Sequence, residues 1–169
     1  MRKAIILLGL MAIAAAPASP VTSLAGRYSK HFQNGMVDGS KFWSDDVVEI
    51  VPIDATHAYF RADLAFYNGH SCGITGVAKA VGSKLVYSEK QPMYDGGPTC
   101  RLTISAKGKA LLLDDGDSSC QGYCGARGSL SNYDFIPFSS KRPISYMPRL
   151  KGSSQYKDAI AAWKSGKTD

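Results

Sequence analysis

The stretch Ala58-Tyr59-Phe60-Arg61-Ala62-Asp63-Leu64-Ala65-Phe66-Tyr67 (residues 58–67) decides the fold class. Arg61 and Asp63 fall on one face of an extended chain, because successive side chains of a strand point to opposite sides. Period-two alternation of this kind predicts a half-buried β-strand. Its inward face would consist of Phe60, Ala62, Leu64 and Phe66.

Segments of similar character lie on both sides of this one, and turn residues separate them. Asn68-Gly69-His70 and Lys107-Gly108 predict tight turns, whereas residues 33–45 carry enough turn chemistry to predict a long first loop. Further strands are expected at residues 26–32, 47–53, 72–80, 83–89, 99–106, 110–114 and 129–138. The pattern predicts a mainly β fold, an antiparallel meander-like small barrel (or sandwich) of about eight strands, with a C-terminal helix.

The segment at 72–80 has small residues on its inward face. Gly76, Ala78 and Ala80 share that face with Cys72 and Ile74. Glycine inside a strand often marks the close approach of another part of the chain. We therefore expect a tightly filled interior.

The C-terminal part differs from the β domain, which we place at residues 19–138. Residues 139–152 combine prolines with basic residues and predict an extended linker. Residues 153–166 predict an amphipathic helix capped by Ser153-Ser154 and closed by Gly166. A helix this short is marginal alone, so its apolar stripe must pack on the barrel or on a partner. That stripe comprises Tyr156, Ala159, Ile160 and Trp163.

The N-terminus predicts export. Arg2 and Lys3 precede an apolar run from Ala4 to Ala16 and a small-residue exit at Ala18, the layout of a secretory signal peptide at residues 1–18. We expect a periplasmic or secreted protein without a transmembrane segment in the mature chain. Loss of the two basic residues lowers the formal charge from +6 to +4 (6 − 2), and this scattered charge does not favour a nucleic-acid partner.

The four cysteines all lie in the exported part. An even number in an oxidising compartment predicts two disulfide bonds, although zinc is the rival interpretation. Cys100 begins one strand and Cys120 follows the next, so a hairpin would bring them to the same end and leave Cys72 for Cys124. The alternatives are 72–100 with 120–124 and 72–120 with 100–124.

The segment 114–128 is the densest unusual stretch and the candidate binding loop. Its glycines and two cysteines would fix an irregular path, and binding residues concentrate on loops held by a rigid scaffold. Arg127 is the candidate polar anchor, because arginine engages carboxylates bidentately. Tyr123 and Asp117 are the other candidate contacts. Asp114, Asp115 and Asp117 suggest calcium, but solvated Asp-Gly turn chemistry explains them better.

The sequence contains no pattern that specifies catalysis. A Gly-x-Ser-x-Gly motif is absent, the three histidines are scattered, and disulfide bonding would remove the thiolates. We therefore expect a binding protein without a cofactor or metal rather than an enzyme. A small-ligand carrier with a lipid or sugar pocket is the alternative, and a hydrolase with spatially paired carboxylates is a weaker one.

Three cysteine-containing elements carry a family resemblance that covers roughly residues 58–130. They are Phe66-Tyr67-Asn68-Gly69-His70-Ser71-Cys72, Cys100-Arg101-Leu102-Thr103-Ile104 and Cys120-Gln121-Gly122-Tyr123-Cys124-Gly125-Ala126-Arg127-Gly128. The chain resembles small exported proteobacterial proteins of unassigned function and is also similar to the β-domain of LprI-type lysozyme-inhibitor-like proteins. The resemblance implies a periplasmic binding module, with a cell-wall hydrolase as its protein partner.

Overall fold

The computed structural model describes residues 18–131 and 136–169, so the predicted signal peptide lies, except for Ala18, outside the described residues. The strands are β1 (Gly26–Gly35), β2 (Lys41–Pro52), β3 (His57–Ala65), β4 (Ser71–Val81), β5 (Lys84–Ser88), β6 (Arg101–Lys107), β7 (Ala110–Asp114) and β8 (Ile136–Pro137). The α-helices are α1 (Pro20–Ser23), α2 (Met147–Gly152) and α3 (Ser154–Lys164). Three short 3-10 helices complete the elements: η1 (Tyr67–Gly69), η2 (Gln121–Tyr123) and η3 (Phe138–Ser140).

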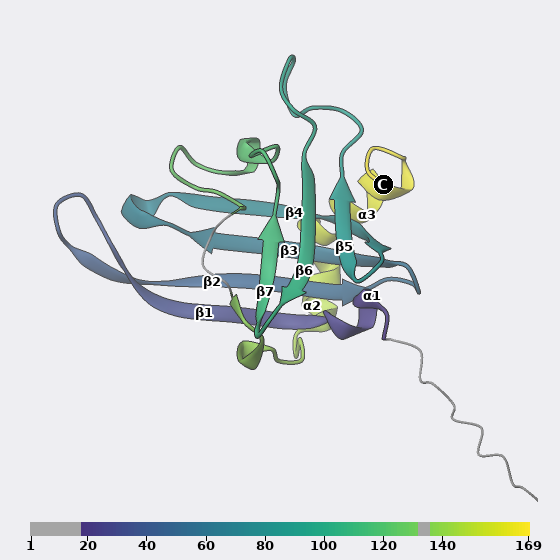
Figure 1. The fold of residues 1–169 in the computed structure, drawn as a ribbon, viewed down its shortest axis with the longest axis horizontal. Helices are drawn as coiled ribbons and strands as arrows, with labels where there is room; N and C mark the ends of the chain where they lie inside the picture. Colours follow the sequence, from purple (N-terminus) through teal and green to yellow (C-terminus); the bar gives the residue numbers. More distant parts are fainter. Residues whose placement is uncertain (1–17, 132–135) are drawn as a thin grey trace, which may run out of the picture.

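The eight strands form one sheet in chain order, and each strand is antiparallel to the next. In Figure 1 the long strands β1–β4 run across the view, and the shorter β5–β7 cross in front of them. The sheet thus curls into a nearly closed barrel. The predicted antiparallel meander is confirmed.

Residues beyond β8 bring the end of the sheet back to β1. Arg27 and Arg142 exchange two main-chain hydrogen bonds, with N···O distances of 2.9 and 2.8 Å. Tyr28 and Phe138 pack edge to face, with ring centroids 5.5 Å apart. These contacts hold the first and last strands together without a full ladder.

Aromatic side chains fill the interior of the barrel at Gly76. Gly76 lies directly opposite Phe60 in the β3–β4 ladder. A Cβ atom at this position would lie only 2.5 Å from the ring of Tyr87 and 2.9 Å from that of Phe60. The predicted close approach is therefore confirmed, because the space of one methyl group is already taken by two rings.

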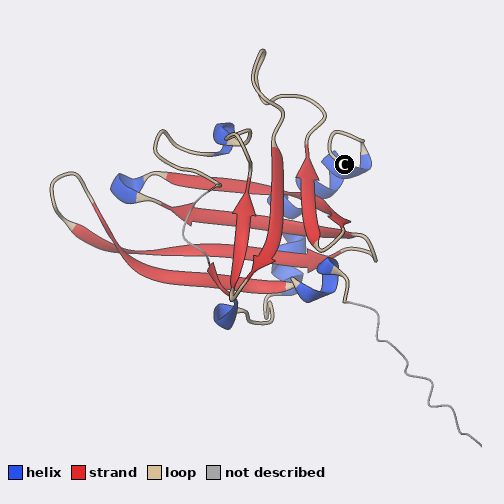
Figure 2. Cartoon of the chain, in the orientation of Figure 1, coloured by secondary structure: helices blue, strands red, loops and turns tan. Residues whose placement is uncertain are grey.

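Helices α2 and α3 cover the outer face of the long strands. Val51, Tyr59, Leu150 and Ala159 form a second apolar cluster there, separate from the barrel core. Figure 2 shows these helices behind the strands. Because Ala159 of α3 shares this cluster with Val51 and Tyr59 of the strands, the apolar stripe packs on the protein's own barrel. Helix α3 begins as predicted, because the Ser153 hydroxyl accepts a hydrogen bond from the amide of Tyr156 at 3.3 Å.

The prediction of a long loop at residues 33–45 is wrong. Strands β1 and β2 continue as a hairpin until Gly35 pairs with Lys41, which leaves only residues 36–40 for the turn. The side-chain amide of Asn34 donates to the carbonyl oxygen of Phe66 at 2.9 Å and to Ser44 Oγ at 3.2 Å. This turn-forming residue is thus held by neighbouring segments and stays within the strand.

The strand predicted at residues 129–138 is also much shorter. Among the described residues only Ile136 and Pro137 pair there, while residues 132–135 lie outside the description. Ser129 donates its hydroxyl proton to the carbonyl of Ser131, and Ser131 bonds to Asp115. Such local side-chain hydrogen bonds compete with a strand ladder.

The linker expected to be extended at residues 139–152 contains a helix. Residues 147–152 form α2, and Pro148 lies in its first turn. Proline is tolerated there because the first helical amides have no partner within the helix. Within the described part of the chain, no helix is both long and apolar enough to cross a membrane.

Candidate functional site

Two disulfides join the candidate binding loop to the sheet. Cys100 bonds to Cys120, with Cα atoms 4.4 Å apart, and Cys72 bonds to Cys124. This is the pairing that the hairpin geometry favoured, and it excludes the two alternatives. Cys72 and Cys100 lie at or next to the starts of β4 and β6, so the loop is attached to two separate strand ends.

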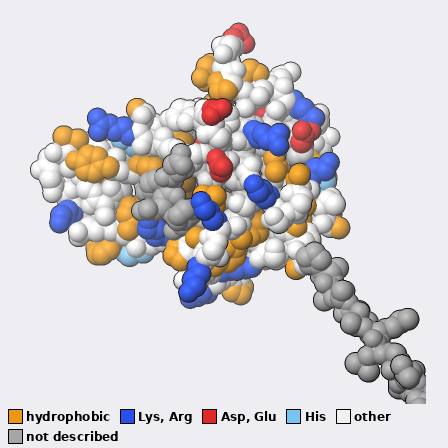
Figure 3. All heavy atoms as spheres, in the orientation of Figure 1, with side chains coloured by type: hydrophobic (Ala, Val, Ile, Leu, Met, Phe, Trp, Pro, Cys, Tyr) orange, Lys and Arg blue, Asp and Glu red, His pale blue; other side chains and the backbone are white. Residues whose placement is uncertain are grey.

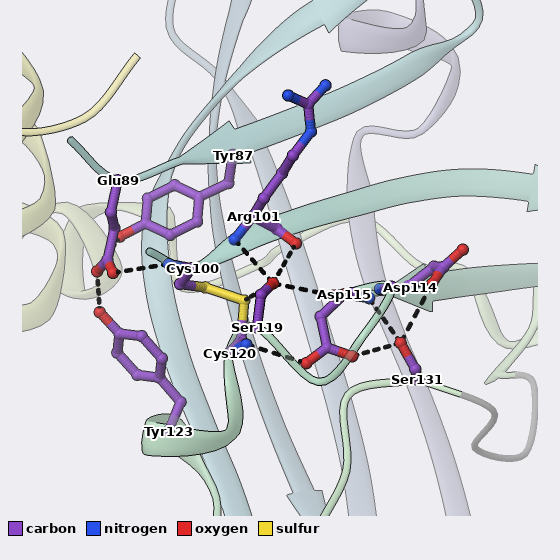
Figure 4. Close-up of a disulfide and its surroundings, with 11 residues drawn as sticks. Tyr87, Glu89, Cys100, Arg101, Asp114, Asp115, Ser119, Cys120, Tyr123 and Ser131 are labelled. Atoms are coloured by element: carbon purple, nitrogen blue, oxygen red, sulfur yellow. Dashed lines mark hydrogen bonds between the residues drawn. A yellow bond between two sulfur atoms is a disulfide. The ribbon is translucent and has the colours of Figure 1, made fainter. Parts of the chain in front are cut away.

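The first half of the loop folds around a buried carboxylate. Asp115 accepts a hydrogen bond from the amide of Cys120 at 3.1 Å and another from the hydroxyl of Ser131. Ser119 connects this segment to β6, because its hydroxyl oxygen accepts from the amide of Arg101 at 3.2 Å. Figure 4 shows these contacts beside the Cys100–Cys120 bond. The path of residues 115–120 is therefore fixed by internal bonds.

The second half packs against the start of β4. The amide of Gly125 donates to the carbonyl of Ser71 at 2.8 Å. At Gly128 a Cβ atom would lie 2.7 Å from Cys72 Sγ, so only glycine lets the loop pass this close to the disulfide. The second of these contacts explains why a glycine stands at position 128.

Glu89 connects the loop to the barrel through two tyrosines. The hydroxyl groups of Tyr87 and Tyr123 both donate to Glu89 Oε1, the former at 3.0 Å, and the amide of Cys100 donates to Oε2 at 3.4 Å. Burial, followed by the hydrogen bond to Glu89, raises the pKa of Tyr123 to about 12. Burial also raises the pKa of Tyr87, and the charge on Glu89 adds to the increase. Both phenols therefore stay protonated and act as donors.

The three predicted contact residues occupy different environments. Arg127 and Asp117 are exposed, whereas Tyr123 is partly buried and packs against the core. The structure thus uses Tyr123 to hold the loop and leaves Arg127 and Asp117 facing solvent. The sequence did not distinguish these roles, because the partner of Tyr123 lies 34 positions away.

A second loop, residues 89–100 between β5 and β6, lies beside the stapled loop. A Cβ atom at Gly122 would lie 2.9 Å from the sulfur of Met93, so the two loops touch. Met93 and Tyr94 nevertheless leave 51% and 59% of their surface exposed. Figure 3 shows hydrophobic side chains on the loop that projects at the top of the view. Apolar and charged side chains therefore occur together on adjacent loops.

The acidic residues of the loop do not share one environment. Asp114 Oδ1 accepts from the amide of Gly116 at 2.9 Å, the turn chemistry expected, and Asp117 is exposed. Asp115, which the sequence placed in the same solvated turn, is instead buried, because its carboxylate organises the loop. In residues 18–131 and 136–169, no three His, Cys, Asp or Glu side chains are grouped so that they could hold a metal ion.

The structural role of Glu89 and Ser131 was missed from the sequence. Glu89 ends a predicted strand as an ordinary polar residue, and Ser131 lies in a segment expected to be extended. The contacts that join separate segments, of Glu89 with Tyr123 and of Ser131 with Asp115, span 34 and 16 positions, so no local pattern identifies them. In comparisons with protein-family models, with curated proteins and with solved structures, no match to this chain was found.

Proposed function

We propose that this protein is an exported binding module that presents the stapled loop, residues 114–128, to a protein partner. The observation that carries the proposal is the attachment of this loop to two strand ends by disulfides, together with the exposure of Arg127 and Asp117. A loop fixed before association loses less conformational entropy on binding. Two disulfides support export, because such bonds persist in oxidising compartments.

The composition of the adjacent loops favours a protein as the ligand. Interface cores are enriched in tyrosine, methionine and arginine. Tyr94 and Met93 supply the apolar part, and Arg127 supplies a group able to bind a carboxylate with two hydrogen bonds. The resemblance to LprI-type proteins implies a cell-wall hydrolase as the partner class. Arg127 would then engage an acidic group in the partner's catalytic cleft.

The carrier alternative gains no support at the centre of the barrel. The rings of Phe60 and Tyr87 occupy the space next to Gly76. A lipid or sugar would have to displace these rings. The loop surface is therefore the better candidate.

Inhibition of peptidoglycan lysis tests the proposal. The purified mature protein, added in excess to lysozymes of several types, should slow lysis, and Arg127→Ala should weaken inhibition by about tenfold or more, as expected for an interfacial arginine. Lys84→Ala, which removes one positive charge from the exposed first position of β5, is the matched control. Undiminished lysis with every lysozyme would exclude the inhibitor role. Equal effects of Arg127→Ala and Lys84→Ala would show that the stapled loop is not the surface that binds the lysozyme.

A further inference from the structure

A cavity lined by four arginines lies away from the stapled loop. It has a volume of about 550 Å³ and is bounded by β1, β3 and the segment from Arg142 to Ser153. The guanidinium groups come from four places in the fold: Arg27 on β1, Arg61 on β3, Arg142 after η3 and Arg149 on α2. Elements far apart in sequence thus bring one kind of charge to one cavity.

Two of these arginines pair with a buried carboxylate. Glu49 on β2 lies opposite Arg27 in one ladder and opposite Arg61 in the next, and its side chain is fully buried. Arg61 Nε lies 3.1 Å from Glu49 Oε2, Arg27 Nε lies 4.0 Å from Oε1, and the Tyr146 hydroxyl also donates to Oε1. Burying a carboxylate requires such partners. Arg27 and Arg61 therefore have a structural task.

The contact between Arg61 and Glu49 is an ion pair without hydrogen-bond geometry. Arg61 Nε and Glu49 Oε2 are both buried, and neither has a hydrogen-bond partner among the described residues. Buried polar atoms are normally satisfied. Beside the cavity, Arg61 Nε and Glu49 Oε2 thus remain without hydrogen bonds to any residue that the structure describes.

The other two arginines are not needed to neutralise Glu49. Arg142 Nη1 donates to the carbonyl oxygens of Ser139 and Lys141, and Arg149 lies over the ring of Tyr146, 5.0 Å from its centroid. Within residues 18–131 and 136–169, neither forms an ion pair with a carboxylate. Asp63, which pairs with Arg61 at 3.2 Å, is the second acid beside the group. Four guanidinium groups against two carboxylates leave an excess of two positive charges (4 − 2 = 2).

We propose that this cavity binds a phosphate ester. Arginine recognises phosphate through paired hydrogen bonds, and a phosphate monoester carries nearly two negative charges at neutral pH, which matches the excess. The cavity is larger than one phosphate group, and Tyr146 and Leu150 provide an apolar wall for the organic part of the ester. Arg142 and Arg149 would make the direct contacts. The site shares no lining residue with the stapled loop, so it does not depend on the function proposed for that loop.

Calorimetry with glycerol phosphate tests the inference on the full mature protein at low salt. Binding is expected, and Arg142→Gln and Arg149→Gln should each weaken it by about tenfold, the effect of losing one charge-assisted hydrogen bond. Arg101→Gln removes the same charge from an exposed site on β6 and should change the affinity less than about twofold, since only long-range charge is lost. Sedimentation with vesicles that contain phosphatidic acid, whose headgroup is a phosphate monoester, compared with phosphatidylcholine vesicles, provides a second arm. Vesicle binding that is lost in the same two variants assigns the ester to a lipid headgroup, and binding of glycerol phosphate alone assigns it to a soluble ligand.

Three outcomes would overturn the inference. The first is no binding in either arm, and the second is binding that neither variant weakens. The third is an equal loss in Arg101→Gln, which would show attraction by net charge alone. Arg142 and Arg149 are exposed, so both variants should fold, and circular dichroism with a thermal melt verifies this. Because the lysis assay uses Arg127, failure of one proposal leaves the result of the other unchanged.

Discussion

At the scale of single residues, Gly76 shows how the interior of this barrel is filled. The rings of Phe60 and Tyr87 meet edge to face, with centroids 5.3 Å apart, in the space that a side chain at position 76 would need. Aromatic pairs of this geometry add to the free energy gained by burial alone. The glycine is therefore a packing requirement of the two rings.

Gly76→Ala should destabilise the protein by about 1–3 kcal/mol, because overpacking forces rings and strands apart. Gly73→Ala on the same strand is the matched control, since the nearest atom to its Cβ would be Asp63 Oδ1 at an ordinary 3.7 Å. Chemical denaturation of the two variants measures the difference in the free energy of unfolding. Equal stability of both would show that the interior at Gly76 has room to spare.

At the scale of elements, the sequence predicted those strands whose pattern is local. The alternation at residues 58–67 and the small inward residues at 72–80 correspond to β3 and β4, because period two follows directly from strand geometry. The β1–β2 hairpin was misjudged, because Asn34 is held by Phe66 and Ser44 rather than by its own turn. Local composition contains no information about such partners.

The same distinction applies to the candidate site. Hairpin geometry predicted the Cys100–Cys120 bond, since it concerns two strands joined by one turn, and Cys72–Cys124 followed as the remaining pair. The contacts of Asp115 with Ser131 and of Tyr123 with Glu89 depend on how separate loops meet. The arginine cavity was likewise missed, because its four guanidinium groups come from four separate segments.

Helix α3 provides a prediction at this scale. Ser153→Ala removes the hydroxyl that accepts from the amide of Tyr156 and donates to the carbonyl of Leu150 at 2.7 Å. Loss of a helix N-cap should lower the free energy of unfolding by about 1 kcal/mol. Ser154→Ala, one position later and inside the helix, should change stability far less. Thermal unfolding of both variants measures the effect, and a loss as large for Ser154→Ala would contradict the role of the cap.

At the scale of the whole molecule, the end of the chain joins the sheet near Glu89. Thr168 pairs with Glu89 as an isolated bridge, and the amide of Lys90 donates to the carbonyl of Lys167 at 3.0 Å. Lys90 also forms an ion pair with Asp169. The segment around Glu89 thus connects the β5 edge, the stapled loop and the C-terminal helix.

Stability at alkaline pH should reveal this connection. Burial raises the pKa of Tyr123 from 10.0 to about 12 and also raises that of Tyr87. Between these pH values the folded chain keeps phenol protons that the unfolded chain has lost. The contribution of these tyrosines to the free energy of unfolding is therefore fully present below pH 10 and decreases as the pH rises toward 12. Each such tyrosine lowers the free energy of unfolding by up to about 1.4 kcal/mol per pH unit. Tyr123→Phe should therefore weaken the pH dependence of the free energy of unfolding, measured by urea denaturation above pH 10. The same substitution destabilises the protein at neutral pH, because it removes the hydrogen bond to Glu89.

Tyr94→Phe, on the exposed loop, is the control for losing a phenol. If the free energy of unfolding of Tyr123→Phe fell with pH as steeply as that of the wild type, the Glu89 contact would not couple the loop to global folding.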